Sequence, residues 1–235
     1  MSENSPQVTG PEEMPEPAPL FEAAILFSLG AAMLALFLFA WLGNEMLQGD
    51  TQHFDQAVRA WVHSYASPAM TRVMNAISLL GYNILIVELL VALAVFAKLR
   101  WRRAAVWLTV AMAGSLVLDL TLKYIYHRTR PTAYFGMAPH SYSFPSGHAM
   151  CSFCFYGVLA GLLSARTKPL GWRLLIWSTA AALIIAIGLS RIYLGVHYPS
   201  DVVAGYLAAT VWVGTIIVLD HIRKRRQKSK QVPAK

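Results

Sequence analysis

The chain has 235 residues, of which 56% are hydrophobic and 14% charged, and it carries a formal net charge of +8. So apolar a composition excludes an ordinary soluble domain of this length and indicates an integral membrane protein. A net positive charge can also point to a nucleic-acid partner, so the location of the basic residues decides what it means.

The first 20 residues contain several Pro and Glu but no Lys or Arg, a composition typical of a disordered polar tail. A secretory signal peptide needs a basic segment before its apolar run, so we expect the first apolar run to remain as a membrane span. We therefore predict a disordered tail over residues 1–20, a membrane domain over residues 21–221 and a basic tail over residues 222–235.

Six apolar runs are long enough to cross about 30 Å of hydrocarbon at about 1.5 Å of helix per residue. They lie at residues 21–42, 77–97, 104–126, 149–165, 170–189 and 202–219. The fourth run is short, and we expect its helix to begin at Ser146 or His148. The predicted fold is an all-α integral membrane protein with six transmembrane helices.

The segment between the first and second runs has apolar residues at helical spacing, namely Phe54, Val58, Trp61, Val62 and Tyr65. This spacing predicts an amphipathic helix that lies on the extracytoplasmic membrane surface, where Trp and Tyr are favoured. We expect the apolar face of this helix to pack against the bundle.

The basic residues divide by loop. The loops after the second and fourth runs and the tail after the sixth carry fourteen of the twenty Lys and Arg. The positive-inside rule places these segments and both termini in the cytoplasm. The net charge is therefore a topology signal, and we expect no nucleic-acid partner.

The two cysteines, Cys151 and Cys154, are spaced as C-x-x-C inside an apolar helical run. A redox motif of this spacing belongs in a strand-turn-helix context, so we expect two small buried side chains and no disulfide.

Six cations remain on the outer side: Arg59, Arg72, Lys123, Arg128, Arg130 and Arg191. Arg59, Arg72 and Arg128 fit ordinary charged flanks of membrane helices. Lys123, Arg130 and Arg191 instead lie at the same membrane level as two histidines and two helix starts, which invites a functional interpretation.

The two helix starts lie within PSGH at residues 145–148 and within HYPSD at residues 197–201. Ser146 is placed to cap the first of these helices, whose free amides suit an anion. Pro199 suits the first turn of the second helix and puts Asp201 near its positive end. Two histidines, one carboxylate and three cations are thus expected on one face.

Three motifs carry these residues: KYIYHRTRP at 123–131, PSGH at 145–148 and SRIYLGVHYPSD at 190–201. Together they resemble the complete three-part signature of the type 2 phosphatidic acid phosphatases, a superfamily that includes bacterial acid phosphatases and vanadium haloperoxidases. The motifs and the six-span layout extend this resemblance over most of the chain.

The resemblance implies that His197 is the nucleophile, that Asp201 orients it, and that His148 is first the general acid and then the base that activates water. It also implies a set of phosphate-binding groups: Lys123, Arg130, Ser146, Gly147 and Arg191. Ser190 belongs to the third motif, and we expect it behind these groups.

Elementary chemistry agrees, because phosphoryl transfer is catalysed mainly by positioning and by charge stabilisation, which three cations and a helix terminus provide without a cofactor. A divalent metal held by His127, His140, His148, His197 and Asp201 is the alternative, although neighbouring Lys and Arg would repel it.

Two acids lie inside predicted spans. Asp119 precedes Lys123 by four residues, so we expect it to pair with that lysine and position it. Glu88 has no evident partner, and a functional role and a hydrogen-bonded structural role both remain open.

The sequence thus predicts a lipid phosphate or diphosphate phosphatase whose site opens on the outer side of the cytoplasmic membrane. Undecaprenyl diphosphate and phosphatidylglycerophosphate are the expected substrates, by analogy with the resembling family. The alternatives are a lipid A phosphatase, a lipid phosphotransferase, and a non-catalytic lipid-phosphate binder or transporter. A haloperoxidase would share the constellation, but six spans argue against it.

Overall fold

The computed structural model describes residues 19–136 and 139–231, and in these residues every regular element is helical. The predicted tail over residues 1–20 lies outside the described residues except for its last two. The elements are α1 (Pro19–Gln48), α2 (Gln52–His63), α3 (Pro68–Leu79), α4 (Asn83–Lys98), α5 (Arg102–Tyr126), α6 (Gly147–Ser152), the π-helical turn η1 (Phe153–Gly157), α7 (Val158–Ser164), α8 (Leu170–Tyr193) and α9 (Pro199–Gln231).

Five helical units of the described chain are long and apolar enough to span a membrane: α1, α5, the α6–η1–α7 unit, α8 and α9. Each overlaps a predicted run. The unit formed by α6, η1 and α7 begins at Gly147, between the two residues expected for its start, and α9 begins at Pro199 as expected. The helical, multi-pass character of the fold is therefore confirmed.

The second predicted span, over residues 77–97, is not one continuous helix. It is divided into α3 and α4, which are bent by 44° relative to each other. At the end of α3 the amides of Leu80, Gly81 and Tyr82 each donate to the carbonyl three residues earlier, which tightens the last turn. A sixth crossing exists only if α3 and α4 count as one, because the 16 residues of α4 measure about 24 Å.

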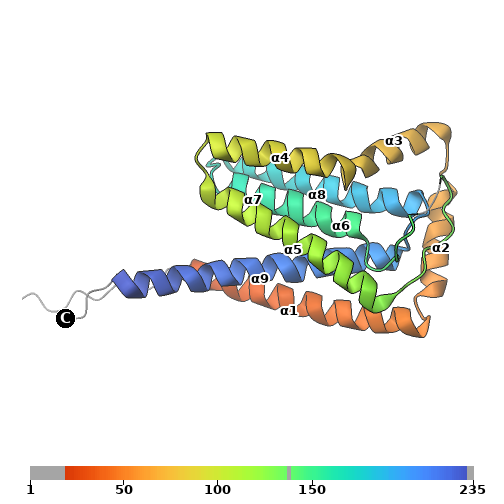
Figure 1. Cartoon of the computed structure of the whole chain (residues 1–235), viewed down its shortest axis with the longest axis horizontal. Helices are drawn as coiled ribbons and strands as arrows, with labels where there is room; N and C mark the ends of the chain where they lie inside the picture. The colour runs from red at the N-terminus through yellow and green to blue at the C-terminus, as the bar shows by residue number, and fades with distance from the viewer. Residues whose placement is uncertain (1–18, 137–138, 232–235) are drawn as a thin grey trace, which may run out of the picture.

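Helix α2 lies across one end of the bundle, as Figure 1 shows, but its orientation differs from the prediction. Val62 packs against buried apolar clusters as expected, but Phe54, Trp61 and Tyr65 are exposed, whereas Asp55 and Arg59 are buried. The polar side chains face inward because they find hydrogen-bond partners in the loop after α5 and in the first turn of α9.

The remaining helices pack around the α6–η1–α7 unit. Helix α1 lies along α9, while α6 contacts α5, α8 and α9 (Figure 1). Helix α9 extends past the other helices at the end opposite α2 and continues beyond residue 221 as far as Gln231.

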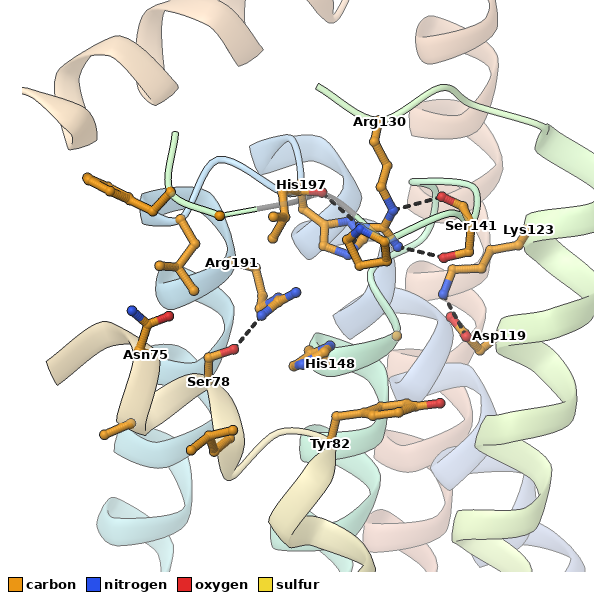
Figure 2. Close-up of a pocket in the computed structure, with 18 of the residues that line it drawn as sticks. Asn75, Ser78, Tyr82, Asp119, Lys123, Arg130, Ser141, His148, Arg191 and His197 are labelled. Carbon is orange, nitrogen blue, oxygen red and sulfur yellow. Dashed lines mark hydrogen bonds and ion pairs between the residues drawn. The ribbon is translucent and has the colours of Figure 1, made fainter. Parts of the chain in front are cut away.

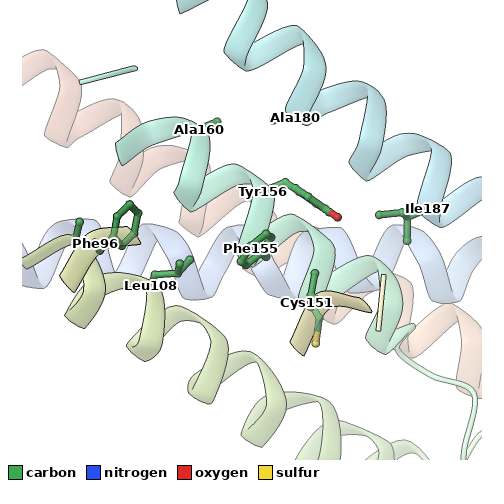
Figure 3. Close-up of a cluster of buried hydrophobic side chains, with 10 residues drawn as sticks. Phe96, Leu108, Cys151, Phe155, Tyr156, Ala160, Ala180 and Ile187 are labelled. Carbon is green, nitrogen blue, oxygen red and sulfur yellow. The ribbon is translucent and has the colours of Figure 1, made fainter. Parts of the chain in front are cut away.

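A buried apolar cluster joins the α6–η1–α7 unit to its neighbours (Figure 3). Leu108 of α5, Phe155 of η1 and Ile187 of α8 are each at most 2% exposed. Cys151 belongs to this cluster, and Cys154 lies in an adjacent one. Both thiols are free and buried, as predicted.

Glu88 of α4 has the structural partner that the sequence left open. The Tyr156 hydroxyl of η1 lies 2.7 Å from Glu88 Oε2 and 3.2 Å from the Leu80 carbonyl oxygen. The π-helical turn therefore holds the corner between α3 and α4, which forms one wall of the site described next.

Candidate active site

The loops after α5 and α8 meet the start of α6 at the end of the bundle covered by α2. They enclose a cavity of about 810 Å³. Figure 2 shows the cavity with side chains from several helices pointing into it. Predicted site residues in its lining are Asp119, Lys123, Arg130, Gly147, His148, Arg191 and His197. The other three, Ser146, Ser190 and Asp201, are buried behind this surface.

His197 is 1% exposed and lies in the loop between α8 and α9. Its Nδ1 is 3.3 Å from Asp201 Oδ2, and its Nε2 is 2.9 Å from Nη1 of Arg130. The carboxylate favours a proton on Nδ1 and so leaves the lone pair on Nε2. Burial lowers the pKa of the His197 imidazole to about 4, against the opposing effect of Asp201, so the ring is neutral at neutral pH.

Arg130 is held by a set of backbone and side-chain acceptors. Its guanidinium donates to the Ser141 carbonyl at 2.7 Å and hydroxyl at 3.0 Å, to the Tyr142 carbonyl at 3.2 Å and to the Val196 carbonyl at 2.8 Å. Burial lowers the pKa of Arg130 from its ordinary value, but a guanidinium stays charged at neutral pH. The group is a fixed cation beside the histidine nitrogen.

Lys123 forms the predicted ion pair with Asp119, one turn earlier in α5, at 2.7 Å between Nζ and Oδ2. The other carboxylate oxygen, Oδ1, is buried without a hydrogen-bond partner. A Cβ at Gly147 would lie 2.8 Å from that oxygen, so only glycine fits between Asp119 and the start of α6. The lysine is thus anchored with its ammonium at the cavity wall.

Arg191, in the last turn of α8, approaches the cavity from the other side (Figure 2). Its Nη1 donates to the hydroxyl of Ser78 on α3, while its Nε is buried without a partner. Figure 2 shows Lys123 and Arg191 on opposite sides of His148, so positive charge surrounds the space between the two histidines.

His148, in the first turn of α6, points into the cavity below His197 (Figure 2). Its ring stacks on Tyr82 at the α3–α4 corner, with 5.3 Å between ring centroids and an interplanar angle of 20°. A Cβ at Gly81 would lie 3.1 Å from His148 Cδ2, so any side chain at this position of the corner would crowd the imidazole. Hydropathy gave no sign of this contact, because Gly81 and Tyr82 lie within an apolar run.

Ser146 and Ser190 are placed differently from the groups in the cavity wall. Ser146 precedes α6, but its hydroxyl makes no capping hydrogen bond and is buried without a partner, so the expected cap is wrong. Ser190 donates within its own helix to the Ile187 carbonyl. The Ser146 hydroxyl is therefore a donor at the start of α6 that no described group uses.

Arg59 and Arg128, expected as ordinary charged flanks, are largely buried, whereas Arg72 is exposed as expected. Arg59 donates to the carbonyls of Thr132 and Gly195. Arg128 forms ion pairs with Asp55 of α2 and with Asp201. The sequence did contain one sign that this side of α2 is buried. Asp55 and Arg59 are four residues apart and lie on the side of the helix away from its aromatic residues.

The alternative metal arrangement finds no geometric support in the described chain, where no three His, Cys, Asp or Glu side chains come together as ligands. His127 instead contacts the ring of Tyr142 edge-on, and His148 stacks on Tyr82.

A bundle of membrane helices that gathers cations, two histidines and a carboxylate around one cavity has the architecture of a membrane phosphatase. The family comparison agrees. The chain belongs to the PAP2 superfamily, whose family model matches residues 104–225. It is therefore an enzyme, a lipid phosphatase of this family, as the three motifs predicted.

Individual relatives support the assignment. Phosphatidylglycerophosphatase B of Bacillus subtilis is 27% identical over 83% of this chain and 98% of its own length. Decaprenylphosphoryl-5-phosphoribose phosphatase of Mycobacterium tuberculosis is 33% identical over 70% of this chain and 86% of its own. The crystal structure of a transmembrane PAP2-type phosphatidylglycerolphosphate phosphatase from B. subtilis matches the fold with a TM-score of 0.73 and 24% identity, over 81% and 96% of the two chains.

Proposed function

We propose that this protein hydrolyses the terminal phosphate of a membrane lipid through a phosphohistidine formed on His197. The observation that carries the proposal is the environment of this one ring. Asp201 lies at Nδ1, and Nε2 faces the fixed guanidinium of Arg130 at the cavity. A neutral imidazole with its lone pair held beside a phosphate-binding cation is prepared for in-line attack on phosphorus.

In the first step, Nε2 of His197 attacks the phosphorus atom and the bond to the leaving oxygen breaks. His148 donates a proton to that oxygen as the lipid alcohol or lipid phosphate departs. In the second step, His148 accepts a proton from water, the new hydroxide attacks phosphorus, and the bond to nitrogen breaks. Inorganic phosphate leaves and both rings regain their starting states.

The charge that develops on the phosphoryl oxygens meets donors from three sides. Lys123 and Arg130 approach from the α5 side and Arg191 from α8, while the Ser146 hydroxyl and the Gly147 amide lie at the start of α6. Asp119 keeps Lys123 in place. Such fixed donors are worth most in a transition state, since they need no reorganisation when charge shifts.

Phosphatidylglycerophosphate is the first candidate substrate and undecaprenyl diphosphate the second. The B. subtilis relative, whose name states the first activity, matches along almost its full length. A second relative is named for a decaprenyl lipid, so both acyl and prenyl lipids occur among the relatives of this chain. We further propose that the enzyme lies in the cytoplasmic membrane with both termini inside and the site outside. Fourteen of the twenty basic residues lie in the loops after the second and fourth predicted spans and in the C-terminal tail, and the positive-inside rule places such segments in the cytoplasm.

The test is phosphate release by purified protein in detergent with EDTA, over a panel of lipid mono- and diphosphates. Wild type, His197→Ala, His148→Ala and the exposed-histidine control His53→Ala are compared. We expect release by wild type and His53→Ala and almost none by the other two. Turnover by purified His197→Ala would disprove the phosphohistidine, and a product that appears only with an added acceptor lipid would identify a phosphotransferase.

A further inference from the structure

A buried ionic cluster lies on the side of Asp201 away from the cavity. Arg128 donates from Nη1 to Asp201 Oδ1 at 2.6 Å and from Nη2 to Asp55 Oδ2 at 2.7 Å. The guanidinium also lies 4.1 Å from the ring centroid of Tyr198. One arginine therefore bridges the carboxylate beside the candidate nucleophile and a carboxylate of the surface helix α2.

Arg128, Asp55 and Asp201 do not line the main cavity, although Arg128 borders a second pocket beside Lys123 and Arg130. Asp55 is fully buried, and its carboxylate also accepts from the amide and hydroxyl of Ser200, at 2.9 and 2.6 Å. Arg128 makes further bonds to the Ser200 hydroxyl and the Thr51 hydroxyl. Because it binds Asp201 from behind and does not line the main cavity, Arg128 has the surroundings of a support for Asp201 and not those of a phosphate ligand.

The bonds to Asp201 show what such a support achieves. Its Oδ2 accepts from the Ser143 hydroxyl, the Tyr198 amide and His197, so the opposite oxygen is left to Arg128. A carboxylate held at both oxygens cannot rotate, and it presents one fixed lone pair to the imidazole. In addition, a buried carboxylate without a cation would hold a proton more readily, on itself or on the ring.

We propose that Arg128 and Asp55 are positioning residues for the nucleophile: they fix Asp201, and through it His197. This inference rests on the proposed role of His197. It extends the catalytic support to α2, a helix outside the family match at residues 104–225 whose opposite face carries exposed aromatic side chains. Asp55 lies outside all three motifs, and Arg128 lies in the first motif at one of the six positions between Lys123 and Arg130, to which the resemblance assigns no role.

Charge makes the inference testable. The titratable and charged groups that face the His197–Asp201 pair are Asp55 of α2, Arg128 and Arg130 of the loop after α5, His148 of α6 and Arg191 of α8. Removal of Arg128 takes away one positive charge in direct contact with the pair. The pair then binds its extra proton more tightly, and the acid limb of the activity profile moves to higher pH by about one unit.

The experiment compares Arg128→Met with Arg59→Met, a matched control that removes a second buried arginine whose described hydrogen bonds go to backbone carbonyls. Both variants are checked for folding by gel filtration, and kcat and KM are measured from pH 5 to pH 8 beside wild type. The ratio of each variant's kcat/KM to that of wild type cancels the ionisation of the substrate itself.

For Arg128→Met we expect kcat to fall about 10- to 100-fold, KM to change little, and the ratio to drop further toward low pH. For Arg59→Met we expect a ratio independent of pH. A pH-independent ratio in both variants, or wild-type kcat in folded Arg128→Met, overturns the inference.

If Arg128→Met does not fold, Arg128→Lys decides. Lysine keeps the charge but cannot hold two carboxylates with a planar fork, so we expect a lower kcat with the acid limb in place, and wild-type kcat overturns the inference. His197→Ala is measured in the same series. If it is active, the proposed function has failed, whereas an inactive His197→Ala beside an unaffected Arg128 variant rejects only the inference about Arg128 and Asp55.

Discussion

Arg130→Lys is the sharpest test of how this site stabilises charge. The substitution keeps a cation at the cavity but replaces a planar fork with five N–H groups by a single ammonium. In the structure four hydrogen bonds to Ser141, Tyr142 and Val196 fix the guanidinium, and a fifth points at Nε2 of His197, where the phosphoryl group is expected. An ammonium has three donors on one atom and cannot reproduce this arrangement.

The expected changes in KM and kcat follow from the hydrogen-bond donors that lysine cannot replace. Because Lys123 and Arg191 remain to bind the ground-state phosphate, KM should stay within about threefold of wild type. The misplaced donor is lost mainly in the transition state, where removal of one fixed oxyanion donor costs about 10²- to 10³-fold in kcat, or about 3 to 4 kcal/mol. We therefore expect Arg130→Lys to retain about 1% of wild-type kcat.

The assay is initial-rate phosphate release in mixed detergent–lipid micelles at varied surface concentrations of substrate, which separates kcat from KM. Arg103→Lys is the control, since Arg103 is largely exposed and pairs with Asp220 at the opposite end of the bundle. A kcat for Arg130→Lys within twofold of wild type would show that charge alone suffices at this position and would refute the argument from geometry.

Two further predictions concern the corner and the topology. Gly81→Ala should lower kcat about tenfold, because the new Cβ would lie 2.5 Å from Ile187 Cγ2 and 3.1 Å from His148 Cδ2. Gly30→Ala is the control, since the space around its Cβ is open, and its kcat should stay at the wild-type value. Equal kcat values for the two variants would contradict the crowding of His148. In intact cells, a cysteine introduced at the exposed Ser141 should react with a membrane-impermeant maleimide, and one introduced at Ser229 should not. The native Cys151 and Cys154 are buried and should give little background labelling. The reverse labelling pattern would show that the orientation in the membrane is opposite to the one proposed.

Hydropathy and charge were enough to predict most of the fold, since a membrane helix has to be long and apolar. The break between α3 and α4 escaped prediction because an average over residues 77–97 conceals a local change of hydrogen bonding at Leu80–Tyr82. The contact of Tyr82 with His148 and that of Ser78 with Arg191 depend on this break, so they could not be foreseen either.

The candidate site was predictable where residue spacing is local, as for Lys123 and Asp119, or where charges remained unexplained by topology, as for Arg130 and Arg191. Arg128 and Asp55 were missed for a physical reason. A charge on a helix flank or an amphipathic helix is usually solvated, and only the fold shows that these two groups are 73 positions apart in sequence yet joined in the interior.

The cluster behind His197 has a consequence that a count of formal charges makes visible. Asp55 and Asp201 contribute −1 each and Arg128 contributes +1, so the three groups sum to −1. Beside a neutral imidazole the buried set remains anionic, whereas beside the cationic ring of a phosphohistidine the sum is zero. The groups behind the ring therefore balance its charge once it is phosphorylated, while Arg130 and the other cations that line the cavity are left to face the phosphoryl oxygens. Asp55, Asp201 and Arg128 lie on the side of the histidine away from the cavity, so this balance of charge is independent of which lipid delivers the phosphate.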